Sequence, residues 1–248
     1  MKHIGILAHS AEGAALCFLE ACHAGEGKLG AHNHPDITLD IVAMGAAMPL
    51  WERHDYAGVR EILARSCERL ARAGADFFVC PDNTAHLALE TDGPALALPG
   101  LHIAEIVGEM AKARGYRRVG LLGTKWTMEG SAYVNAFARH GLEYRVPPRA
   151  QRADMNAIIF DELVRGQFRD TSRARVVAMI DDLKREGCDA VALSCTEIPL
   201  LVTQDVSPLP ILDSTRLLAR AAADVALGEK PMPAWCGGSP IAPPPASV

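Results

Sequence analysis

The feature that most constrains the fold of this chain is an internal repeat. Residues 4–7 (IGIL) match residues 119–122 (VGLL) at an offset of 115, and residues 74–76 (GAD) match residues 187–189 (GCD) at an offset of 113. In each copy a helix is expected to end at the glycine, a buried strand follows, and a polar cluster begins eight residues after that glycine. The chain is therefore predicted to contain two copies of one structural plan.

Short apolar runs alternate with longer segments of helical periodicity along the whole chain, which is typical of α/β proteins with parallel sheets. The clearest amphipathic helices are expected near residues 57–73 and 172–186, and a terminal helix near 214–227. The expected strands are residues 3–7, 37–43, 76–80, 118–122, 189–193 and 209–212.

We therefore predict two pseudo-symmetric domains, each a mostly parallel sheet flanked by helices, with the active site in the cleft between them. The first domain is expected to comprise residues 1–100 plus 209–230, and the second residues 101–208. The Pro-rich segment 231–248 has no periodicity and is expected to be an extended or mobile tail.

Charge and composition exclude several classes of function. The net charge of −5 comes without any basic run, so nucleic acid is not an expected partner. No apolar stretch approaches the roughly 18 residues that a membrane span needs, and a cytoplasmic location is expected. The seven cysteines are an odd number without CxxC spacing, so neither disulfides nor a zinc site is predicted. His32 and His34 have no nearby third ligand, and no metal or other cofactor is expected.

Two polar clusters follow corresponding strands of the two copies. Asp82, Asn83 and Thr84 follow the third predicted strand, and Cys195, Thr196 and Glu197 stand at the matching place in the second copy. Ligands of open α/β sheets bind at the carboxyl ends of the strands, so the clusters are expected to face one small substrate from opposite sides. Such an arrangement suits removal of a proton from one face of a carbon and supply of a proton to the other.

A cysteine between a strand and a helix lies where backbone N–H groups favour its thiolate, the form that acts as a base. A lone cysteine after an apolar strand is more often inert. Cys195 is the catalytic candidate because of its place in the repeat, and Asp82 is the candidate on the opposite side of the substrate. Neighbouring polar residues are predicted to bind substrate, although local capping is an alternative for several of them, Glu197 included. This set comprises His9, Ser10, Asn83, Thr84, Thr124, Thr127, Thr196 and Glu197.

Four segments carry a resemblance to a known family: CPDNTAH (80–86), GLLGTKWTM (120–128), SCTEIPLL (194–201) and ILDST (211–215). Together they resemble the aspartate/glutamate racemase superfamily, and HNHPDI (32–37) and LPGLHIAE (98–105) resemble its aspartate racemase branch. The resemblance covers about residues 1–228. It implies a cofactor-independent, usually dimeric isomerase acting at the α-carbon of an amino acid. It also implies that Asn83, Thr84, Thr124 and Thr196 bind the substrate carboxylate.

One position departs from the family pattern. The family usually has a cysteine before the Asn-Thr pair, where this chain has Asp82, while Cys80 is expected to point the same way but lie deeper. Carboxyl groups have a reference pKa of about 3.9 against about 8.5 for thiols, so the pair is expected to be asymmetric.

Three alternatives follow from this asymmetry. The first is a racemase or epimerase, expected to act on an acidic amino acid and to have unequal directions. The second is a one-cysteine isomerase, lyase or decarboxylase of a small carboxylic acid, and the third is a non-catalytic amino-acid-binding homologue. Arg53, Arg165 and Arg169 are the candidates to bind an acidic side chain. The expected partners are one small amino acid or dicarboxylate and a second copy of the chain.

Overall fold

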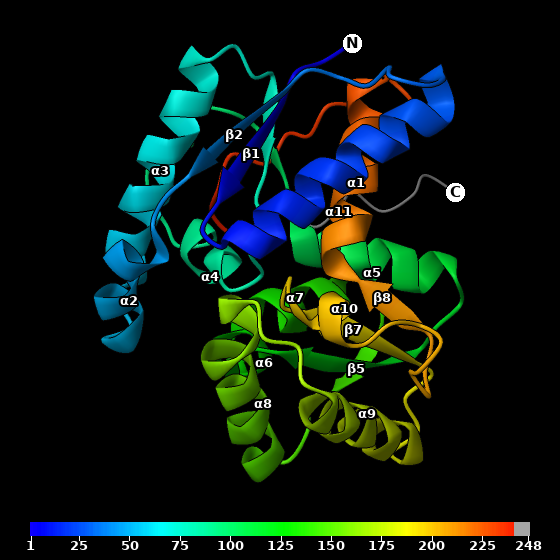
Figure 1. Cartoon of the computed structure of the whole chain (residues 1–248). Helices are drawn as coiled ribbons and strands as arrows, with labels where there is room; N and C mark the ends of the chain where they lie inside the picture. Colours follow the sequence, from blue (N-terminus) through cyan, green and yellow to red (C-terminus); the bar gives the residue numbers. More distant parts are fainter. Residues whose placement is uncertain (241–248) are drawn as a thin grey trace.

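The computed structural model describes residues 1–240 and contains two parallel four-stranded sheets of identical strand order (Figure 1). The first sheet has the order β2-β1-β3-β4, and the second has the order β6-β5-β7-β8. The α/β fold with two related halves, predicted from the repeat, is thereby confirmed. The strands of the first sheet are β1 (Ile4–Ala8), β2 (Ile37–Ile41), β3 (Phe77–Val79) and β4 (Gly100–Leu101), and those of the second are β5 (Arg118–Gly123), β6 (Glu143–Arg145), β7 (Ala190–Ser194) and β8 (Ile211–Asp213).

Helices connect the strands and cover both faces of each sheet, as parallel sheets require. None of the helices in residues 1–240 is both long and apolar enough to cross a membrane. The first half contains α1 (Ala11–Leu29), α2 (Met44–Glu52), α3 (Tyr56–Arg72), α4 (Ala85–Leu89) and α5 (Ile103–Ala113). The second contains α6 (Lys125–Glu129), α7 (Ser131–Arg139), α8 (Arg149–Asp161), the 3-10 turn η1 (Leu163–Arg165), α9 (Asp170–Arg185), α10 (Ile198–Leu201) and α11 (Ser214–Ala226).

The last helix of each copy packs against the other copy. Helix α11 follows the last strand of the second sheet but lies against α1, and its Leu218 and Ala222 share a core with Ile4 and Ile6 of β1 (Figure 1). Helix α5 follows the last strand of the first sheet, and its residues share a core with β5, β7 and α7. This exchange joins the two halves through buried apolar surface, whose removal from water is the main stabilising term of a fold.

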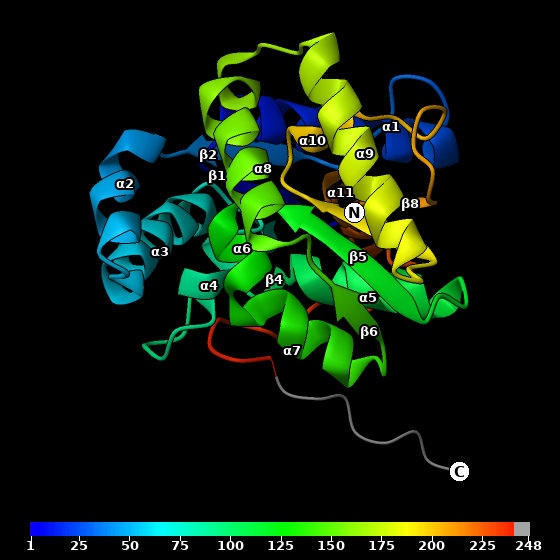
Figure 2. The same cartoon turned by 90° about the horizontal axis from the view of Figure 1, so that it is seen from below.

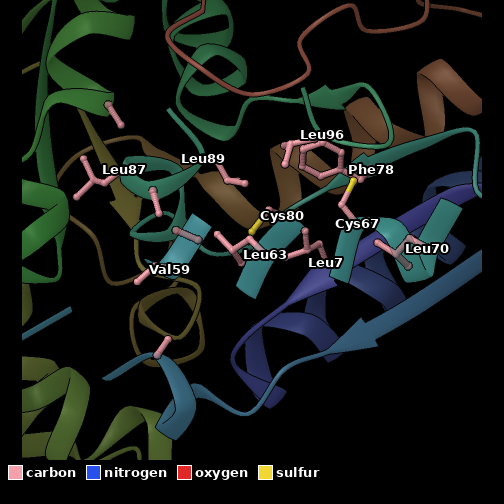
Figure 3. Packing of buried hydrophobic residues seen from close by; sticks show 14 of the residues in the cluster. Leu7, Val59, Leu63, Cys67, Leu70, Phe78, Cys80, Leu87, Leu89 and Leu96 are labelled. Atoms are coloured by element: carbon pink, nitrogen blue, oxygen red, sulfur yellow. The ribbon is translucent and has the colours of Figure 1, made fainter. Parts of the chain in front are cut away.

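The opposite face of each sheet has its own core. In the first half, the apolar stripe of α3 packs on the sheet, with Leu63, Cys67 and Leu70 beside Leu7 and Phe78 (Figure 3). In the second half, α8 and α9 cover the face of the sheet that α5 and α7 do not (Figure 2). The two sheets are thus held with the carboxyl ends of their central strands facing one another.

Two features differ from the sequence expectations. Strands β4 and β6 are not among the expected strands, because their sequences, Gly-Leu and Glu-Tyr-Arg, contain no apolar run. The strand expected at 209–212 is β8. From the sequence it is expected in the first domain with the helix that follows it, yet β8 pairs with β7 of the second sheet. Residues 231–240 follow an extended path, as expected, across the first half, where the Trp235 carbonyl accepts from the Gly100 N–H at 2.7 Å. The rest of the predicted tail, residues 241–248, lies outside the described residues.

Candidate active site

A cavity between the two halves is lined by residues from the carboxyl ends of four central strands. His9 and Ser10 follow β1, Asp82, Asn83 and Thr84 follow β3, and Thr124 follows β5. Ser194, Cys195, Thr196 and Glu197 lie at and after the end of β7. The space, open mouth included, is about 530 Å³. The structure therefore brings Asp82 and Cys195, from different halves of the repeat, to one cavity.

The chain around Asp82 is held by local hydrogen bonds. The Asp82 side chain accepts from the Ala85 N–H at 3.1 Å. The buried His86 bonds the Asp82 carbonyl through Nδ1 at 2.9 Å, and its Nε2 accepts from the Ile103 N–H at 3.2 Å. Because Nε2 is an acceptor, Nδ1 carries the proton and donates it. Burial lowers the pKa of His86 well below its ordinary value, so this neutral form fixes the position of Asp82.

Cys80 does not supply the thiol that is missing at position 82. Its side chain lies in the core between α3 and the first sheet, close to Leu63 and Leu7, and it does not line the cavity (Figure 3). Burial raises the pKa of the Cys80 thiol well above its ordinary value. The expectation that Cys80 points the same way as residue 82 is wrong, because strand β3 ends at Val79 and the alternation of a strand no longer applies after it.

Cys195 lies at the cavity beside a buried carboxylate. Its Sγ–H donates to Oε2 of Glu197 at 3.0 Å. Burial raises the pKa of the Cys195 thiol well above its ordinary value, and the charges of Glu197 and Asp82 act in the same direction. The thiolate expected from the strand–helix junction is therefore not the resting form, because burial and two carboxylates outweigh the backbone N–H groups. Glu197 therefore accepts the hydrogen bond of the Cys195 thiol at the cavity.

Hydroxyl groups pair across the two halves in a symmetric way. Thr84 follows β3 and Thr124 follows β5 of the other half, and their Oγ1 atoms are 2.9 Å apart. Ser10 follows β1 and Thr196 follows β7 of the other half, and the Ser10 Oγ is 3.4 Å from the Thr196 Oγ1. Both Ser10 and Thr124 also cap the helix that follows them. The cavity thus has a pair of hydroxyl groups on each side, and hydroxyls can donate to a carboxylate.

The amide of Asn83 is oriented by a buried network. Its Oδ1 accepts from the Tyr133 hydroxyl at 2.6 Å, and its Nδ2 donates to the Ser214 hydroxyl at 3.0 Å. Ser214 in turn donates to the Leu193 carbonyl at 2.9 Å. Neither Tyr133 nor Ser214 was singled out from the sequence. The ILDST segment that contains Ser214 was the one signal that could have found it.

Three buried polar atoms at the cavity lack a partner within residues 1–240. They are Nε2 of His9, Oγ of Ser194 and Oε1 of Glu197. Buried polar groups are nearly always hydrogen-bonded, so atoms of this kind that line a cavity are suited to a ligand. A carboxylate oxygen accepts from an ammonium group, and an imidazole nitrogen can donate to a carboxylate. An amino acid carries both of these groups.

Several predicted site residues lie elsewhere. Thr127 is buried behind the cavity lining, with its hydroxyl 3.0 Å from that of Thr84, so it can act only through other residues. Arg53, Arg165 and Arg169 do not line the cavity. Arg53 bonds Asp55, and Arg169 bonds Gln167. His32 and His34 lie at exposed loop positions. Residues 1–240 contain no group of three or more His, Cys, Asp or Glu side chains that could hold a metal ion.

A family model described as Asp/Glu/hydantoin racemase matches residues 20–222. The chain belongs to this family. The match confirms the resemblance drawn from the sequence motifs and places this racemase-family chain among the isomerases.

Known members of the racemase family differ in how closely they match this chain. The broad specificity amino-acid racemase RacX of Bacillus subtilis is 24% identical over 168 residues, 67% of this chain and 72% of RacX. A structure from Yersinia pestis described as a candidate Asp/Glu racemase is 31% identical with a TM-score of 0.79, covering 92% of this chain and 100% of that one. An aspartate racemase homologue from Pyrococcus horikoshii is 27% identical with a TM-score of 0.76 and the same coverage. Two glutamate racemases match over 55% and 50% of their own length.

Proposed function

We propose that this racemase-family chain interconverts the enantiomers of an amino acid by proton transfer at the α-carbon, without a cofactor. The observation that carries the proposal is the shared cavity, which is lined by Asp82 from one half and Cys195 from the other. Racemisation requires a proton to leave one face of the carbon and another to arrive at the opposite face. Two proton-carrying groups on separate domains meet that requirement.

The substrate would be held by its two polar groups. The α-carboxylate would lie against the hydroxyls of Ser10 and Thr196, at the start of the 19-residue helix α1, whose N-terminus favours negative charge. The ammonium group would donate to Oε1 of Glu197, which lacks a protein partner within the described chain. These contacts would place the α-carbon between Asp82 and Cys195.

In the resting state the thiol of Cys195 is protonated, because its pKa is raised by burial and by neighbouring carboxylates. In one direction the carboxylate of Asp82 removes the α-proton, and Cys195 delivers its own proton to the opposite face. The C–H bond breaks on one side as a new one forms on the other, which leaves Asp82 protonated and Cys195 as a thiolate.

In the other direction the thiolate of Cys195 removes the proton, and the acid form of Asp82 returns one. This direction starts either from the state left by the first, or after Cys195 has passed its proton to Glu197, 3.0 Å away, and Asp82 has taken up a proton from solvent. The two directions use different groups, so we expect their rates to be unequal.

The test is proton NMR in deuterated water with both enantiomers of a panel of amino acids. In the native protein, deuterium should appear at the α-carbon together with inversion. Cys195→Ala should abolish both. Asp82→Asn should leave exchange without inversion for one enantiomer only, because a thiolate alone can remove and return protons on a single face. Unchanged exchange in Cys195→Ala would overturn the assignment.

A second candidate is an isomerase, lyase or decarboxylase that uses Cys195 alone. The burial of Cys80 in the core favours it, since the site offers a single thiol. Conversion of a small carboxylic acid to a different compound in the same NMR assay would support this candidate. Binding without any exchange would instead support a non-catalytic homologue. The homodimer and the cytoplasmic location stay predictions, and the apolar lining of the cavity argues against the expected acidic side chain.

A further inference from the structure

One wall of the cavity is apolar and is built from both halves of the chain. It holds an aromatic row in which Trp51 of α2 lies 6.2 Å from Trp126 of α6, and Trp126 lies 5.8 Å from Phe160 of α8, between ring centroids. The row therefore spans from the first domain to the second across the site. The complete apolar lining comprises Met44, Met48, Trp51, Trp126, Ile159, Phe160 and Val164.

No lysine or arginine is among the residues that line this cavity in the described part of the chain. Its ionisable lining side chains are His9, Asp82, Cys195 and Glu197. Lys125 is the neighbour of Trp126, yet its side chain is exposed, with Nζ 4.4 Å from the centroid of the Trp126 ring. The site therefore carries two carboxylates and no permanent positive charge.

This distribution of charge discriminates between substrates. In the proposed function the polar groups of the site engage the ammonium and α-carboxylate that every amino acid has. A second carboxylate, as in aspartate or glutamate, would lie against the apolar wall without a cation and close to Asp82 and Glu197. An unpaired charge next to like charges in a desolvated site is strongly unfavourable. An apolar side chain on the same wall is favoured instead, by about four-fold in affinity for each buried methylene group.

We propose that the substrate is an amino acid with an uncharged, apolar side chain, such as leucine, methionine or phenylalanine. Its α-carbon would lie between Asp82 and Cys195, and its side chain would pack against Met48, Trp51 and Phe160. The proposal rests on the function proposed above for the reaction itself. The preference in binding, apolar amino acids before acidic ones, does not depend on that reaction. It replaces the acidic substrate that was expected for the racemase.

The experiment compares leucine, methionine and phenylalanine with aspartate and glutamate, each as both enantiomers, in the deuterium exchange assay. We expect kcat/KM to be at least about 100-fold higher for the apolar group, a ratio typical of discrimination by a pocket. Met48→Arg places a cation in the apolar wall and should lower the rate with leucine while raising the rate with aspartate. Met48 is only half-buried, so the arginine can be accommodated. Met44→Arg repeats the test from the previous turn of α2.

Met232→Arg is the matched control, because Met232 is 39% exposed and lies outside the cavity lining. It should leave the ratio of rates unchanged. Faster exchange of aspartate or glutamate than of leucine would overturn the substrate class and leave the racemase intact.

Exchange of no amino acid would overturn the racemase. The substrate class would then be decided by the thermal shift of the native protein with leucine and with aspartate. A larger shift with leucine would support the apolar pocket, and a larger shift with aspartate would overturn it.

Discussion

Replacing Gly13 by alanine tests whether the two halves meet as closely as the site requires. Gly13 lies in the first turn of α1, where an added Cβ would fall 2.2 Å from Oγ1 and 2.6 Å from Cβ of Thr196, in the other half. Both separations are shorter, by about 1 Å or more, than a normal contact of 3.5–4.0 Å between non-bonded atoms. Gly13→Ala must therefore push α1 away from Thr196 and separate the Ser10 and Thr196 hydroxyls.

The expected size follows from two opposed contributions. Alanine in a helix is more stable than glycine by roughly 0.5–1 kcal/mol. Overpacking of a tight contact costs about 1–3 kcal/mol. Gly13→Ala should thus lower the free energy of unfolding by about 1–2 kcal/mol. It should also lower kcat/KM by about 100-fold, because a shift of about 1 Å misplaces the substrate between its two proton carriers.

Gly27→Ala is the control within the same helix, since an added Cβ at Gly27 would meet nothing within 4 Å. It should stabilise the protein slightly, by roughly 0.5 kcal/mol, and leave activity unchanged. Urea denaturation gives the free energies, and deuterium exchange at the α-carbon gives the rates. Equal stability and equal activity of the two variants would refute the close approach of α1 to Thr196, and with it the arrangement of the site.

Two further substitutions probe the side chains behind the site. Glu197→Gln should shift the alkylation of Cys195 by iodoacetamide to lower pH, because the variant removes a carboxylate that raises the pKa of the thiol. Burial still holds that pKa above its ordinary value. The same variant should lower exchange by about 100-fold or more through loss of the proton acceptor, and faster exchange would contradict that role. Tyr133→Phe removes the buried donor to Asn83 and should cost about 1–3 kcal/mol in urea denaturation. Tyr56→Phe, at a surface hydrogen bond, should change stability by less than about 0.5 kcal/mol, and equal losses would argue against the network.

The site could be predicted from the sequence only where local pattern fixes it. The glycine–strand–cluster unit placed Asp82 and Cys195 at equivalent positions, and the cavity includes both. The partners of these residues could not be found in the same way. Glu197 was expected to cap a helix or bind substrate, and its contact with Cys195 depends on how the chain turns after β7. Tyr133 and Ser214 reach Asn83 from 50 and 131 residues away along the chain.

The apolar wall shows the same limit. Met48 and Trp51 belong to the first half, and Phe160 belongs to the second. Nothing in their sequence spacing distinguishes them from ordinary core residues of amphipathic helices. Only the packing of α2 opposite α8 makes them one surface, and that surface changes the expected substrate from an acidic to an apolar amino acid.

The sequence by itself determined the duplicated α/β plan and the two polar clusters, because strand and helix periods and the glycines that end helices are local properties of the chain. The tertiary structure decided which sulfur faces the cavity, which carboxylate accepts a hydrogen bond from it and which helices exchange between the halves. These depend on contacts between segments far apart in the chain, whose geometry is set by the burial of both cores together.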